Sequence, residues 1–414
     1  MRKIAFGVAA VIVGLSVALM LGEVALRLAN RPAPEVIGWT GDGGPGGPGR
    51  PGEKNEFGFR GHHVDARSRV RIVLLGDSQV EAAGTDFQDM PEVQLRTVLA
   101  ERFSEDVTVA SIASLGWGQD QELLALQTYL DAIHPTAVVL WFTEANDLWN
   151  NTFPTHLPKD GFPKPTFWLE GAELKGPNLE WLASYRPPGL YLAQAIHRVQ
   201  GLSKYPTDGD WESRLPPPYR AAIPPPGTRS LVRALAEEHG IQVTALPFFD
   251  FEDFDSEKTH YSAYFVPESP RLRYAAALTR ALLFRIRQLC EAKGAQFVVL
   301  TTERWETSGL PELPTMFEVN GKGYTLSQAS ARRVIDEVLE GLPTIRVRGI
   351  PHAAVLSKTD SHWNRDGNQF AMQWLGRELL SERYHSGSPP LAPDAEPDRT
   401  RAPRLPAHRR ISGR

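Results

Sequence analysis

The sequence is poor in the residues that form disulfides and cysteine-based metal sites. Cys290 is the single cysteine among 414 residues, so no intrachain disulfide can form. It lies in an apolar helical stretch with no His or Asp in a recognisable motif, so we interpret it as a core residue and not as a catalytic thiol. The chain also has no His-x-x-x-His pair. We therefore expect no metal ion and no other cofactor.

A strong charge bias is absent as well. The chain has 45 basic and 49 acidic residues, for a formal net charge of -4. This balance gives no basis for a nucleic-acid partner. The 42% of hydrophobic residues indicate that most of the chain is globular.

The N-terminus has a long apolar run. Arg2 and Lys3 precede an uncharged stretch from Ile4 to Gly22. As a helix this stretch would be roughly 28 Å long, about the thickness of the hydrocarbon core of a bilayer. It is longer than most signal-peptide cores, and Glu23 follows it instead of a clear cleavage site. We predict an uncleaved membrane anchor over residues 1–29, in preference to a cleaved signal or a buried helix. The positive-inside rule then places the rest of the chain on the extracytoplasmic side.

Composition divides the remainder of the chain. Residues 30–56 are rich in glycine and proline and predict a flexible linker. Residues 57–385 form the expected folded domain. It contains a proline- and aromatic-rich insertion at about 153–227, with a small hairpin turning at Glu170-Gly171. Residues 386–414 lack apolar periodicity and predict a disordered basic tail.

Apolar runs alternate with helical patterns along the folded domain. Strands are expected at Val70–Leu75, Val107–Ile112, Ala137–Phe142, Gln242–Leu246, Gln296–Thr301 and Thr344–Val347. Helices are expected from a capping box at Asp89–Glu92 to Phe103, from an N-cap at Asp120 to Ile133, and at Arg229–His239, Arg271–Lys293, Leu326–Leu339 and Asn364–Leu380. Continuous apolar strands are typical of a sheet covered on both faces. The pattern therefore favours an α/β fold, a three-layer α/β/α sandwich with a central, mostly parallel sheet.

A serine follows the first expected strand, in the stretch Gly76-Asp77-Ser78. Open α/β sheets bind ligands at the carboxyl ends of their strands, so Ser78 is a candidate nucleophile. A serine needs a base, and His362 follows Asp360 by two residues. In an extended segment these two side chains point the same way. Asp360 could then orient the imidazole of His362, which would take the proton of Ser78.

Attack on an ester carbonyl creates an oxyanion that needs positioned donors. The backbone N–H of Ser78 is one candidate. Gly116, after the second strand, could offer its N–H close to a substrate because it has no side chain. Asn146, after the third strand, could offer its side-chain amide. All three follow strands, so we expect them to meet at one edge of the sheet.

At these residues the sequence resembles the SGNH hydrolases, also called GDSL-type esterases or lipases. The four matching blocks are Gly76-Asp77-Ser78, Gly116, Asn146-Asp147 and Asp360-x-His362. The resemblance extends over roughly residues 57–150 and 240–384, and the anchor and the Phe57–Gly61 lead-in look like membrane-anchored bacterial members. It implies a flavodoxin-like SGNH fold, with Ser78 as nucleophile and His362 as base. It also implies Asp360 as the residue that orients His362, and Gly116 and Asn146 as oxyanion donors.

The sequence departs from the family pattern at two places. Glu144 stands where the family often has glycine, two residues before its Asn, and it could repel an oxyanion or point away from it. The acid of Asp360-x-His362 lies two residues before the His, whereas many members place it three before. This shorter spacing is similar to that of proteins with this fold that acetylate exported polysaccharides.

Three functions are compatible with these motifs. The first is a serine esterase that cleaves an O-acyl ester, for instance an acetyl ester, of a carbohydrate or lipid. The second is an O-acyltransferase acting on an exported polysaccharide, with Trp168 among the aromatic residues of the insertion that could bind sugar. The third is a catalytically degenerate envelope protein, for which Glu144 is the support. The sequence leaves the acyl group, the alcohol and the oligomeric state open.

Overall fold

The computed structural model of the chain describes part of its length. The described residues are 13–25, 52–103, 106–144, 146–152, 155–156, 162–178, 262–268, 270–302, 316–319, 322–351, 354–355 and 362–381. The expected helix at Arg229–His239, the strand at Gln242–Leu246 and the tail at 386–414 lie outside them, as does Asp360.

A five-stranded sheet forms the centre of the fold. Its strands are β1 (Val70–Gly76), β2 (Val107–Ala113), β3 (Ala137–Phe142), β9 (Gln296–Thr301) and β12 (Thr344–Arg346). Their spatial order is β12-β9-β3-β1-β2, and every neighbouring pair is parallel. Counted along the chain, this is the 2-1-3-4-5 order of flavodoxin-like folds. The predicted parallel sheet is confirmed, and the five apolar runs form its strands.

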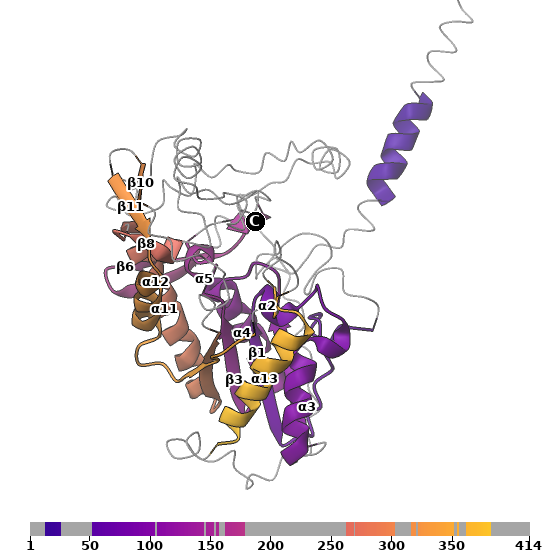
Figure 1. Ribbon diagram of the computed structural model, residues 1–414. Coiled ribbons are helices and arrows are strands. Elements are labelled where there is room, and N and C mark those ends of the chain that lie inside the picture. The colour runs from indigo at the N-terminus through magenta and orange to yellow at the C-terminus, as the bar shows by residue number, and fades with distance from the viewer. Residues whose placement is uncertain are drawn as a thin grey trace, which may run out of the picture.

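Helices cover both faces of the sheet (Figure 1). One side has α4 (Gln119–Ile133), α11 (Pro270–Ala292) and α12 (Gln328–Leu339), and the other has α3 (Pro91–Phe103) and α13 (Arg365–Leu379). Alternate residues of β1 reach the two layers: Val73 packs with the first group of helices and Leu74 with the second. The predicted three-layer sandwich is therefore confirmed.

The sheet has a switch point between β1 and β3. The chain leaves β1 toward α3 on one face, and it leaves β3 toward α11 on the other. The two helices lie on opposite faces because β2 and β9 lie on opposite sides of the β1–β3 pair. A right-handed crossover to one side of the pair passes over one face of the sheet, and a right-handed crossover to the other side passes over the other face. The loops after β1 and β3 therefore separate at the carboxyl edge, where such sheets bind ligands.

The fold also contains several shorter elements. They are α2 (Ser78–Glu81), α5 (Asp147–Asn150), the 3-10 helices Phe87–Asp89 and Ser262–Tyr264, and the strands β4 (Thr155–His156), β5 (Phe162–Pro163), β6 (Thr166–Glu170), β7 (Glu173–Asn178), β8 (Phe265–Val266), β10 (Met316–Val319) and β11 (Lys322–Leu326). The antiparallel β6–β7 pair is the hairpin expected at Glu170-Gly171, and Gly171 has a φ of +62° in its turn. The three-stranded sheet β10-β11-β8 was not predicted.

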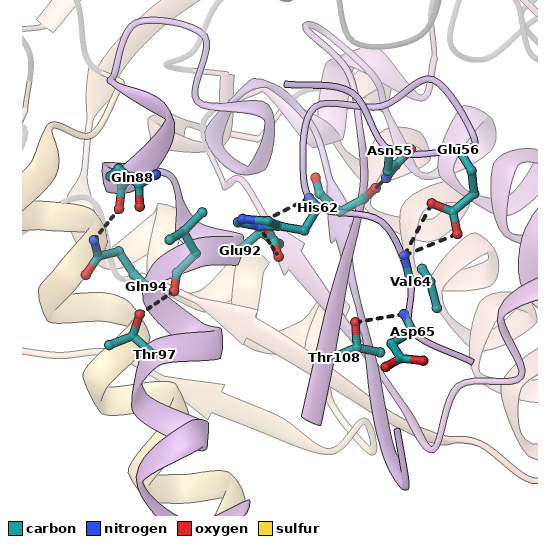
Figure 2. Close-up of polar contacts among 12 residues, drawn as sticks. Asn55, Glu56, His62, Val64, Asp65, Gln88, Glu92, Gln94, Thr97 and Thr108 are labelled. Carbon is teal, nitrogen blue, oxygen red and sulfur yellow. Dashed lines mark hydrogen bonds and ion pairs between the residues drawn. The ribbon is translucent and has the colours of Figure 1, made fainter. Parts of the chain in front are cut away.

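The cap predicted for α13 is confirmed, because the side chain of Asn364 accepts the backbone N–H of Gly367 at 3.0 Å. The capping box predicted for α3 is wrong. Glu92 is buried and accepts the backbone N–H of His62 at 3.3 Å, with His62 Nδ1 at 3.0 Å (Figure 2). The N–H of Asp89, which Glu92 should have accepted, donates to the carbonyl of Asp86 instead.

The cap predicted for α4 is also wrong. The helix begins at Gln119, with Gly118 as its N-cap, so Asp120 lies inside the first turn. The carboxylate of Asp120 binds Lys164 Nζ and accepts the N–H of Gln121 at 2.8 Å. Lys164 comes from the insertion, so the helix sequence alone could not reveal this partner.

A separate helix is described at residues 13–25, with apolar side chains such as Leu15 and Met20 exposed. None of the described helices combines the length and the hydropathy needed to cross a membrane. The described residues therefore do not support the span predicted at Ile4–Gly22, of which residues 4–12 lie outside them.

Candidate active site

Ser78 lies at a tight turn between β1 and α2. It is the first residue of α2 and is half-buried, and Asp77 before it caps the helix by accepting the N–H of Gln79 at 2.9 Å. A Cβ on Gly76 would stand only 2.6 Å from Cγ2 of Val80. Glycine therefore allows α2 to fold back closely on the end of β1, and aspartate starts the helix that presents Ser78.

The carboxylate of Asp77 also joins this turn to the loop after β3. Its Oδ1 accepts the hydroxyl of Thr143 at 3.0 Å, and its Oδ2 accepts the side-chain amide of Asn146 at 2.9 Å. Asp77 and Asn146 are both buried. The two loops that flank the switch point are thus held together, and Asp77 sets the orientation of the Asn146 amide.

The segment of His362 is tied to the same turn. The backbone N–H of Trp363 donates to Oε1 of Gln79 at 3.2 Å, and the indole of Trp363 packs edge-on against that of Trp141 in β3, with ring centroids 5.5 Å apart. Gln79 directly follows Ser78, and Trp363 directly follows His362. The structure therefore brings the neighbours of both residues into contact, while Asp360 lies outside the described residues.

Gly116 lies in the turn after β2 and is buried with a φ of +69°. This left-handed conformation is unstrained only for glycine. The preceding N–H, of Leu115, donates to Oε2 of Glu81 at 2.6 Å, so the β2 loop is bound to the last residue of α2. The side chain of Leu115 is 45% exposed.

Glu81 is a buried carboxyl group with a perturbed pKa. Burial raises its pKa to about 7, against the opposing effects of the Leu115 N–H and of Arg60. Asp77 adds a smaller repulsion that raises it further. Glu81 therefore changes charge near neutral pH.

Arg60 binds the backbone at the C-terminal end of α2. Its buried guanidinium donates to the carbonyl oxygens of Glu81 at 3.3 Å, of Ala82, and of Thr85 at 2.8 Å. The C-terminal carbonyls of a helix lack partners within the helix, so a cation here satisfies them. Ala82 has a left-handed φ of +48°, which this binding helps to hold.

Glu144, the departure noted in the sequence, lies buried just after β3. Its Oε1 accepts the hydroxyl of Thr301 at the end of the neighbouring strand β9. This oxygen is thus engaged on the β9 side of the sheet, whereas the Asp77–Asn146 contact lies on the β1 side.

A buried polar cluster adjoins the loop after β3 that contains Asn146. Oδ2 of Asp147 accepts the N–H of Thr143 at 2.8 Å and the amide of Gln119 at 2.6 Å, and the same amide lies 3.4 Å from Glu122 Oε2. Burial, and then the nearby negative charges, raise the pKa of both Asp147 and Glu122 well above the usual range. Within the described residues, no three His, Cys, Asp or Glu side chains are grouped so as to hold a metal ion.

Four residues of this site were not predicted from the sequence. Gln79 and Glu81 follow Ser78 within α2, Thr143 begins the loop that contains Asn146, and Arg60 belongs to the Phe57–Gly61 lead-in. Their nearness to the motifs was visible in the sequence. Their partners were not, because each partner lies on a different segment.

Comparisons with known proteins give little further information. No family model and no curated protein matches the chain. Among solved structures, a protein described as a GDSL-like lipase from Parabacteroides merdae aligns with 77% of this chain and 99% of its own, at 11% identity and a TM-score of 0.31. A carbohydrate esterase family 2 enzyme with a carbohydrate-binding domain, from Corynascus thermopiles (Myceliophthora fergusii), aligns with 77% of this chain and 69% of its own, at the same identity and TM-score. This degree of similarity establishes neither a shared fold nor a shared function.

Proposed function

We propose that the protein is a serine esterase that cleaves an O-acyl ester of a carbohydrate or lipid. The observation that supports it best is the bond between the N–H of Trp363 and Gln79 Oε1. This bond holds the segment of the candidate base against the helix that begins at the candidate nucleophile.

The proposed reaction has two halves. The hydroxyl of Ser78 attacks the ester carbonyl as His362 takes its proton, and the imidazolium then protonates the departing alcohol, leaving an acyl group on Ser78. A water molecule, deprotonated by His362, attacks this acyl group, and the acid is released as the proton returns to Ser78. We assign to Asp360 the orientation of the His362 ring.

The proposed oxyanion hole consists of the N–H groups of Ser78 and Gly116 and the amide of Asn146. Two of these groups have supporting geometry. Gly116 has a backbone conformation in which a side chain is disfavoured, so its N–H can approach a ligand closely. The amide nitrogen of Asn146 carries two hydrogens, and the bond to Asp77 uses one of them. That bond fixes the direction of the second hydrogen, which we propose donates to the oxyanion.

The proposal extends to where the enzyme works. We propose that the folded domain faces the extracytoplasmic side of a membrane, where esters of exported carbohydrates and of lipids are found. The support is the basic pair Arg2 and Lys3 ahead of the apolar run.

The test uses the full-length protein, a fluorophosphonate probe and p-nitrophenyl acetate. We expect the probe to label Ser78, and we expect Ser78→Ala to abolish both labelling and hydrolysis. Ser381→Ala, at a half-buried serine after α13, is the matched control and should behave as the wild type. Equal rates for wild type and Ser78→Ala on this ester and on acetylated sugars would refute the esterase. Labelling of Ser78 with transfer of acetyl to a polysaccharide and little release to water would replace it with an acyltransferase.

A further inference from the structure

The carboxylate of Glu81 connects two parts of the proposed site. Glu81 ends the four-residue helix α2, which begins at Ser78. Its Oε2 accepts the N–H of Leu115 at 2.6 Å, and the next residue is Gly116. One side chain thus links the nucleophile's helix to the loop that carries an oxyanion donor, and it does so from a buried position.

We propose that Glu81 is a positioning residue whose ionised carboxylate holds the Gly116 loop against the Ser78 helix and thereby switches the oxyanion hole on. This inference rests on the proposed esterase function. Glu81 does not touch the reacting atoms in this proposal. It acts through the backbone of Leu115, which sets where the N–H of Gly116 points.

The physical basis is the difference between the two protonation states. An ionised carboxylate accepts hydrogen bonds only, and its bond to an N–H is stronger than that of a neutral group. A protonated carboxyl is a weaker acceptor, and its own O–H must find an acceptor in the same buried space. Protonation of Glu81 therefore loosens the bond to Leu115, and the loop is released.

Burial and the charged groups facing Glu81 together set the pH at which its carboxyl group ionises. Arg60 and Lys54, both on the segment before β1, favour the carboxylate, and Asp77 at the start of α2 disfavours it. Burial outweighs them all and brings the pKa of Glu81 to about 7. Both protonation states of Glu81 are therefore populated across the physiological pH range.

The bond itself can be observed without any activity. In full-length protein labelled with ¹⁵N-leucine, the amide signal of Leu115 is identified by its loss in Leu115→Ile. We expect this signal to shift with pH along a single transition near 7 in the wild type. The shift should disappear in Glu81→Gln, which keeps the size of the side chain but does not titrate. Glu101→Gln, at an exposed carboxylate on α3, is the control and should leave the transition in place.

The pH profile of kcat/KM for p-nitrophenyl acetate tests the consequence. The proposal requires Glu81 to lose its proton for full activity, and its pKa is about 7. Glu81→Gln should therefore lower the slope of the acid limb relative to the wild type. At pH 8 we expect kcat to fall about 3- to 10-fold in Glu81→Gln, and further in Glu81→Ala, which has no acceptor.

The outcomes separate the two proposals. If Ser78→Ala is inactive but Glu81→Gln keeps the wild-type slope and rate, the role of Glu81 is wrong and the esterase stands. A Leu115 amide that does not titrate in the wild type also overturns the role of Glu81. If Ser78→Ala is as active as the wild type, the esterase itself is wrong, whatever the Leu115 signal does.

Discussion

Oε1 of Gln79 accepts the backbone N–H of Trp363 at 3.2 Å, across 284 positions of the sequence. Gln79 is buried in the four-residue helix that Ser78 begins, and Trp363 lies two residues before the helix α13. This bond joins the segment that carries His362 to the helix that begins at Ser78.

Replacing Gln79 with Leu tests that relationship. The change removes the acceptor and leaves the buried N–H of Trp363 without it, at a cost of about 1–3 kcal/mol. We expect hydrolysis of p-nitrophenyl acetate to fall about 10- to 100-fold, because the base is no longer held in place. Chemical denaturation measures the stability, and steady-state kinetics measures the rate.

Gln94→Leu, which loses only a bond to the carbonyl of Gln88, should keep its activity. A Gln79→Leu enzyme with the wild-type rate would show that the bond has no part in catalysis.

Arg60→Ala should loosen the turn after the nucleophile's helix. Three carbonyl oxygens, those of Glu81, Ala82 and Thr85, lose the guanidinium as a donor. A hydrogen bond to a charged group contributes about 1.5–3 kcal/mol net. The Ala82 carbonyl keeps the N–H and the hydroxyl of Thr85 as donors, so we expect a total loss of about 2–4 kcal/mol. Urea unfolding measures it. Arg67→Ala, at an exposed arginine paired with Asp65, is the control and should leave stability nearly unchanged. Equal midpoints for the two variants would contradict the prediction.

Lys164→Met should destabilise the domain strongly. The side chain of Lys164 is 1% exposed, and its Nζ binds the carboxylate of Asp120, which is also buried. Removing one partner of such a pair leaves an uncompensated charge and costs about 3–5 kcal/mol. Adding Asp120→Asn removes the stranded charge, so the double variant should recover part of the loss. Lys175→Met, on the hairpin with its partner Glu173 exposed, should be nearly neutral. A double variant no more stable than Lys164→Met would show that the ion pair is not the cause.

Glu81 should also make stability depend on pH. Its pKa rises from 4.5 to about 7 on folding, so the unfolded chain ionises at a lower pH than the folded one. The contribution of Glu81 to the free energy of unfolding should therefore be highest below pH 4.5 and fall as the pH rises to 7, by on the order of 3 kcal/mol. Glu81→Gln removes this contribution. We expect Glu81→Gln to gain stability relative to the wild type between pH 5 and pH 8 in urea titrations. A difference that is constant over this range would mean that Glu81 does not titrate there.

Much of the fold followed from local patterns. The apolar runs at Ala137–Phe142 and Gln296–Thr301 coincide with β3 and β9, because the middle of a strand buried on both faces is occupied by apolar residues. Asn364 was recognised as the cap of α13 because capping uses a residue three positions away. Predictions of this kind depend only on neighbours in the sequence.

The two helix caps that were predicted wrongly show the limit of reasoning from local sequence. Glu92 and Asp120 each have the right residue type at the right distance from a helix start, and each binds a distant partner instead, His62 and Lys164. Both carboxylates are fully buried. A buried charge is stabilised by the partner that the tertiary structure supplies, and this overrides the weaker local preference.

The sequence by itself determined the layers of this protein and the strands after which Ser78, Gly116 and Asn146 follow. It did so because burial imposes a short-range period on apolar residues, and because parallel strands share a carboxyl edge. The tertiary structure alone decided how the ends of those strands are joined, through Asp77 to Asn146, Glu81 to Leu115 and Gln79 to Trp363. Each of these bonds joins segments that are far apart in the chain. Their geometry depends on how the whole sheet and its helices pack, and no local pattern contains it.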